Sequence, residues 1–243
     1  MQREIHSWYS PSLNKHMEIV MYGHYGFSLL LLPTAAADFL EYERFLMIDS
    51  LKPHIDAGKV KVFSINSINS ESWLNNHMNP RHKAIRHTQF NRYVYNEVVP
   101  FIKSNTSQST PIITSGASLG ATHSANLFFK RPDLIDGVIA MSGVYDLTTY
   151  TKGYYDDDVY FNSPTHYLPN LNDEYYLPLL QKKSHIHILT GQGDYEAPDA
   201  SRALAGILHS KGITYDLDIW GHDMRHDWTT WRDMLPYVLA NKF

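Results

Sequence analysis

The chain has 243 residues, of which 43% are hydrophobic and 19% charged, and its formal net charge is −4. This composition is typical of a globular protein and excludes a disordered or low-complexity chain. The small negative charge gives no electrostatic reason to expect binding to nucleic acid or to an anionic membrane. Because the chain has no cysteine, disulfides, thiolate nucleophiles and Cys-ligated metals are excluded. We expect a single domain over residues 1–243.

No stretch of the sequence is apolar for long enough to span a membrane. The first residues also lack the charged start, apolar run and small-residue cleavage site of a signal peptide. We therefore expect a cytoplasmic protein without a membrane partner.

The first half of the chain predicts a strand pair and then alternating strands and helices. Residues 5–9 and 17–22 have strand character and flank a Ser-Pro-Ser turn, so we expect them to pair. Residues 27–32 are apolar throughout, which is typical of a strand covered on both faces. After them we expect, in order, a helix over 38–57, a strand over 59–65, a polar loop over 67–79 and a helix over 81–103.

The second half repeats this alternation more regularly. The spacing of apolar residues predicts strands over 111–115, 137–141, 185–189 and 214–220, and helices over 118–130, 199–211 and 228–241. Strands separated by helices form right-handed crossovers and a parallel sheet. The expected fold class is therefore α/β, with a mostly parallel central sheet and helices on both faces.

One long segment, residues 143–183, has no clear period and is rich in tyrosine. An irregular stretch of this length inside a compact domain is often an active-site cover. We expect a cap-like insertion here.

A G-x-S-x-G run, Gly116-Ala117-Ser118-Leu119-Gly120, directly follows a predicted strand and opens a predicted helix. A serine exposed on such a sharp turn has little space around it, so the positions two before and two after it require glycine-sized residues. The helix N-terminus also favours negative charge that develops near the serine. Ser118 is therefore the candidate nucleophile.

A serine nucleophile needs a histidine base and an acid that orients it, in the chain order Ser, acid, His in this architecture. Asp194 follows the predicted strand 185–189 and is the expected acid, whereas Glu196, Asp199 and the aspartates at 156–158 lie further from a strand end. The base is expected at His222 or His226, in the loop after the strand 214–220.

The sequence resembles the esterase-D-like, or putative esterase, family of the α/β-hydrolase fold, which includes feruloyl and siderophore esterases, S-formylglutathione hydrolases and mycolyltransferases. The resemblance is carried by residues 116–143, by the Gly191–Asp194 turn with its following helix, and by 226–232, which resemble an H-x-W-x-x-W-R pattern. It implies a serine carboxylic-ester hydrolase that forms an acyl-enzyme, with His226 as the base and His222 as the alternative. It implies a small-molecule ester as substrate and no cofactor.

The sequence departs from the family after the third strand, where relatives carry His-Gly or Asp-Gly and this chain has Pro33-Thr34-Ala35-Ala36. By position, the resemblance places one oxyanion N–H at Thr34 or its neighbour and the other at Leu119. Backbone donors do not depend on a particular side chain, so the substitution leaves the oxyanion hole possible.

Trp73, in the loop 67–79, and Tyr145, in the insertion, are candidate substrate-binding residues, although such aromatics can equally fasten a loop to its own domain. His222, Asp223, His226 and Asp227 lack a helical arrangement and a further ligand, so no metal site is expected. The alternative functions are an acyltransferase on the same scaffold, a catalytically inactive binding protein and, least favoured, a zinc-dependent hydrolase.

Overall fold

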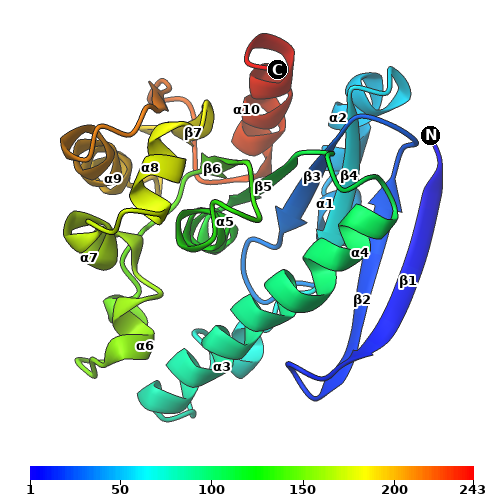
Figure 1. Cartoon of the computed structure of the whole chain (residues 1–243). Helices are drawn as coiled ribbons and strands as arrows, with labels where there is room; N and C mark the ends of the chain where they lie inside the picture. Colours follow the sequence, from blue (N-terminus) through cyan, green and yellow to red (C-terminus); the bar gives the residue numbers. More distant parts are fainter.

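A computed structural model describes residues 1–243 and contains one eight-stranded sheet with the order β1-β2-β4-β3-β5-β6-β7-β8 (Figure 1). Strands β1 (Arg3–Ser10) and β2 (Lys15–Tyr22) pair antiparallel, and β2 also pairs antiparallel with β4 (Val60–Ile65). Every other neighbouring pair is parallel. The predicted antiparallel pair and the mostly parallel sheet are therefore confirmed.

The parallel part of the sheet contains the strands that end at the candidate site. They are β3 (Phe27–Leu32), β5 (Ile112–Ala117), β6 (Gly137–Met141), β7 (His185–Thr190) and β8 (Asp216–Ile219). Nearly all residues of β3, β5, β6 and β7 are buried because helices cover both faces, and this burial explains their continuous apolar runs.

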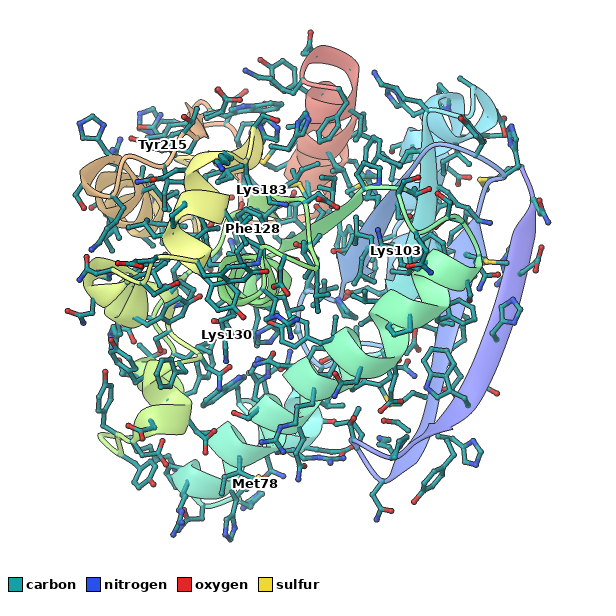
Figure 2. All side chains as sticks on the ribbon, in the orientation of Figure 1. Met78, Lys103, Phe128, Lys130, Lys183 and Tyr215 are labelled. Carbon is teal, nitrogen blue, oxygen red and sulfur yellow. The ribbon has the colours of Figure 1, made fainter.

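One face of the sheet is covered by α3 (Pro80–Tyr93), η2 (Val94–Val98), α4 (Val99–Ser104), α5 (Leu119–Lys130) and α9 (Pro198–Ser210). Their apolar side chains pack against the sheet in a core of 33 buried residues, which includes Phe128 of α5, labelled in Figure 2. None of the helices is both long enough and apolar enough to cross a bilayer.

The opposite face is covered by α1 (Glu41–Arg44), α2 (Met47–Asp56) and the C-terminal α10 (Trp228–Asn241). A second core of 21 buried residues lies between these helices and the sheet. The molecule is therefore a three-layer α/β/α sandwich.

Two predicted helices differ from the observed ones. The helix expected over 38–57 is divided into α1 and α2, because Leu46 between them has a left-handed backbone with φ 61°. The helix expected over 81–103 contains the π-helical turn η2 in its middle. Pro100 follows this turn and has no N–H to donate, so a regular α-helix cannot continue through it with all its hydrogen bonds.

Residues 143–183 connect β6 to β7 through short helical turns rather than an extended loop. These are η3 (Thr148–Tyr150), α6 (Asp157–Tyr160), α7 (Pro164–Tyr167), η4 (Leu168–Asn170) and α8 (Tyr176–Gln181). Leu168 and Leu180 join the same core as α5, so packing as well as polar contacts holds this segment to the domain. A role as a cap over the site stays a prediction.

Candidate active site

Ser118 lies at the sharp turn between β5 and α5, two elements labelled in Figure 1. Its backbone has φ 56° and ψ −126°, a strained conformation for a residue other than glycine. A Cβ atom on Gly116 would lie 2.5 Å from the carbonyl carbon of Gly120, and one on Gly120 would lie 2.5 Å from the carbonyl oxygen of Leu32. These contacts explain the glycine spacing that the sequence predicts around the serine.

His226 lies in the loop between β8 and α10, and its Nε2 is 2.9 Å from the Oγ of Ser118. The Asp227 carboxylate caps the N-terminus of α10 by accepting hydrogen bonds from the N–H groups of Thr229 and Thr230. This cap fixes the loop immediately after the histidine.

Of the two candidate histidines, the structure brings only His226 to Ser118. His222 lies in the same loop, but its side chain is exposed and makes no hydrogen bond to the serine. No group of three or more His, Asp or Glu side chains comes together in a metal-binding arrangement.

The carboxylate that faces His226 is Glu196 rather than Asp194. The Glu196 side chain is 0% exposed, and its Oε2 lies 3.8 Å from the Nδ1 of His226. The Asp194 side chain is 69% exposed and lies 3.6 Å from the Arg225 guanidinium. The expectation that Asp194 is the acid is therefore corrected: it meets His226 only through its main chain, because its carbonyl accepts the His226 N–H at 3.0 Å.

The physical reason for this correction lies in the backbone of the loop after β7. Tyr195 has φ 64°, so the chain reverses its direction between Asp194 and Glu196. A Cβ atom on Gly193 would lie 2.6 Å from the carbonyl oxygen of Met224, which shows how closely this loop packs on the loop that carries the histidine. The distance of a carboxylate from the end of β7 therefore did not predict that Glu196, rather than Asp194, faces His226.

Two hydroxyl groups hold the Glu196 carboxylate. Ser142 Oγ donates to Oε1 at 2.6 Å, and Thr190 Oγ1 donates to Oε2 at 3.0 Å. Burial by itself raises the pKa of Glu196, but the contacts from His226, Ser142 and Thr190 outweigh it and leave the pKa below its usual value. The side chain is consequently ionised at neutral pH and can stabilise positive charge on the imidazole.

The N–H of Thr34 is not available to a substrate. It donates to Oε2 of the buried Glu41 at 2.8 Å, and the Thr34 hydroxyl donates to Oε1 of the same carboxylate at 2.7 Å. The expectation of an oxyanion donor at Thr34 is therefore corrected, because this N–H already has an acceptor. The N–H of its neighbour Ala35 makes no hydrogen bond, and Leu119 begins α5, so its N–H has no acceptor within the helix.

Neither aromatic candidate for substrate binding reaches the surface, since Trp73 and Tyr145 are each 1% exposed. Trp73 packs in a small cluster with Leu119 and Leu147, whereas Tyr145 belongs to the large core on the α5 face. We correct both expectations, because apolar packing against the domain buries these rings.

A family model described as "Putative esterase" matches residues 55–241. Among solved structures, a ferulic acid esterase superposes with a TM-score of 0.74 at 17% identity, covering 98% of this chain and 97% of that one. An S-formylglutathione hydrolase from Staphylococcus aureus gives a TM-score of 0.70 at 15% identity, covering 98% and 96%. MPT51 from Mycobacterium tuberculosis gives 0.68 at 14% identity, covering 99% and 97%. No curated protein sequence matches the chain.

These comparisons confirm the family resemblance and the α/β-hydrolase fold class. At identities of 14–17%, the solved structures establish the architecture of the chain.

Proposed function

Because the chain belongs to the Putative esterase family and is therefore an esterase, we propose that it is a serine hydrolase with Ser118, His226 and Glu196 as its triad. The observation that carries the proposal is the 2.9 Å contact between His226 Nε2 and Ser118 Oγ, two side chains 108 residues apart in sequence. A serine hydroxyl is a weak nucleophile unless such a base removes its proton.

In the first half of the reaction, His226 Nε2 accepts the Ser118 proton while Oγ attacks the ester carbonyl carbon. The tetrahedral intermediate then collapses, and the alcohol leaves with the proton from the imidazolium. In the second half, a water gives its proton to His226 and attacks the acyl-enzyme, which releases the acid and restores the serine.

Glu196 is proposed to stabilise the imidazolium and to select the tautomer with a proton on Nδ1. The 3.8 Å separation is longer than a hydrogen bond, and no other group bonds to His226 Nδ1. Catalytic contacts of this kind are commonly long without a substrate and shorten in its complex.

The oxyanion is proposed to bind the N–H groups of Leu119 and Ala35. Leu119 supplies a free donor at the first turn of α5, where the helix dipole also favours negative charge. Ala35 supplies a donor without a protein partner in the loop after β3. Neither contact requires a metal or a cofactor.

The reaction class is tested with chromogenic esters that differ in acyl length and aromaticity, including a hydroxycinnamoyl ester because one structural relative is a ferulic acid esterase. We expect Ser118→Ala and His226→Ala each to lower kcat by about 10⁴-fold, and the double variant to lose little more. Additive losses would show that the two residues do not act as a unit.

Two further measurements separate the alternatives. A fluorophosphonate probe should label wild type and not Ser118→Ala, whereas an unlabelled wild type would favour an inactive binding protein. Product analysis with and without an acceptor alcohol distinguishes release of the free acid from acyl transfer.

A further inference from the structure

We propose that Glu41 and Asn69 are positioning residues that hold the oxyanion loop, residues 33–36, so that the Ala35 N–H is free to face the reaction centre. The inference rests on the proposed serine-hydrolase function and adds to it the side chains that orient one of its donors. Neither residue touches the reacting atoms.

Glu41 holds the loop from the side of α1. It is 5% exposed, and its two carboxylate oxygens accept from the N–H and the hydroxyl of Thr34. The adjacent Tyr42 is fully buried, and its hydroxyl donates to the carbonyl oxygen of Leu32 at 2.7 Å. Two successive residues of α1 therefore hold the end of β3 and the first residues of the loop.

The first peptide of the loop, between Pro33 and Thr34, has a defined direction. A Cβ atom on Gly120 would lie 2.6 Å from the Pro33 carbonyl oxygen, so this carbonyl packs on the start of α5. Every peptide bond in the chain is trans, and in a trans peptide the N–H points opposite to the carbonyl. The Thr34 N–H consequently points away from α5 and toward Glu41.

Asn69 holds the loop from the other side. Its Nδ2 donates to the Ala35 carbonyl oxygen at 2.9 Å, and its Oδ1 lies 3.0 Å from Nε2 of the buried His123. Burial lowers the pKa of His123 to about 3, so its ring is neutral, and Asn69 Oδ1 accepts when the ring proton is on Nε2. Because His123 belongs to α5, Asn69 connects the loop to the helix that begins at the nucleophile.

These contacts fix the peptides on both sides of the one that carries the Ala35 N–H. Glu41 fixes the peptide between Pro33 and Thr34, and Asn69 fixes the peptide between Ala35 and Ala36. The intervening Ala35 N–H has no partner in the protein. A donor fixed before the reaction begins costs no reorganisation when charge develops on the substrate oxygen.

The test compares Glu41→Ala, Glu41→Gln and the matched control Glu43→Gln. Glu43 lies on the same short helix, but its carboxylate contacts Arg3 and Tyr22 rather than the loop. We expect Glu41→Ala to lower kcat by about 10- to 100-fold and to leave KM within about threefold of wild type. This fall in kcat is smaller than the one expected when an oxyanion donor is removed entirely. Fluorophosphonate labelling of Ser118 should slow by a similar factor.

Glu41→Gln should restore kcat to within about threefold of wild type, because its amide can accept from the Thr34 N–H and donate to the Thr34 hydroxyl. Asn69→Ala is an independent variant and should lower kcat by a similar factor. It tests the proposal if thermal unfolding shows that Glu41→Ala does not fold.

The proposal is overturned if Glu41→Ala or Asn69→Ala, while folded, keeps the kcat of Glu43→Gln. It is also overturned if Glu41→Gln loses as much activity as Glu41→Ala. A wild type that neither hydrolyses esters nor accepts the probe contradicts the proposed function itself, so the two failures are distinguishable.

Discussion

Glu196 and Asp194 are two residues apart, yet their environments are opposite. Glu196 lies buried beside His226 with two hydroxyl donors, whereas Asp194 is at the surface beside Arg225. An acid that stabilises an imidazolium must be fixed and shielded from water, because solvent would otherwise weaken its charge. Only Glu196 meets this requirement.

Replacement of each carboxylate by its amide tests which of the two residues acts as the acid. We expect Glu196→Gln to lower kcat by about 10²- to 10⁴-fold, because the amide loses the charge and brings N–H donors toward the hydroxyls of Ser142 and Thr190. Asp194→Asn should stay within about threefold of wild type, since its side chain is exposed. Steady-state kinetics on one ester checks both, and the reverse order of effects would restore Asp194 as the acid.

A residue of the helix α10 contacts the proposed base and a hydrogen-bond partner of the proposed acid. Trp231 Nε1 donates to Ser142 Oγ at 3.0 Å, and Ser142 in turn donates to Glu196. The same indole and the His226 ring form a T-shaped pair, with ring centroids 5.1 Å apart. One tryptophan of the helix that follows the histidine therefore contacts the proposed base directly and the proposed acid through Ser142.

Trp231→Phe keeps an aromatic ring but removes the indole N–H. We expect kcat to fall by about 3- to 10-fold, which corresponds to roughly 0.7–1.4 kcal/mol and matches the loss of one neutral hydrogen bond. Trp228→Phe is the matched control, because Trp228 stacks on Phe45 and packs edge-to-face with Trp231 without any bond to Ser142. Kinetics and thermal unfolding of both variants check the prediction, and equal kcat values would contradict it.

A seam of buried polar side chains lies between α3, α5 and residues 143–183. His87 of α3 and His123 of α5 have ring centroids 4.3 Å apart, and the amide oxygen of Asn162 accepts from Asn91 and Asn126. Burial lowers the pKa of His87, with His123 and Lys130 adding to the effect, and burial lowers that of His123 to about 3. The folded protein therefore holds both rings neutral.

This seam makes stability dependent on pH. An unfolded histidine titrates near its usual pKa of about 6.5. Below that pH the two imidazoles bind protons in the unfolded state but stay neutral in the folded state. The stabilisation is complete above about pH 6.5 and falls with decreasing pH, by up to roughly 1.4 kcal/mol per pH unit for each ring.

Denaturant unfolding at pH 7.5 and pH 5.5 measures the effect. His123→Gln keeps a donor toward Asn69 and should reduce the difference between the two free energies of unfolding by about 1 kcal/mol. His222→Gln, at an exposed position, should leave the difference unchanged. A His123→Gln variant with the wild-type difference would show that this ring is not the origin of the dependence.

The amino-acid sequence was enough to predict the alternation of strands and helices, the mostly parallel sheet and the turn at Ser118. These features follow from local rules: the period of apolar residues within an element, and the lack of space beside a serine on a sharp turn. The family resemblance also pointed to His226, which the structure places 2.9 Å from the serine.

The three-dimensional fold was needed to show that Glu196 meets the histidine, that the Thr34 N–H is occupied, and that Trp73 and Tyr145 are buried. The direction of a loop side chain depends on the elements packed against it, which here lie far away in the sequence. The left-handed Tyr195 turns Glu196 inward, and Glu41 of α1 occupies the Thr34 N–H. No local pattern encodes such contacts, because each is formed only when separate segments fold together.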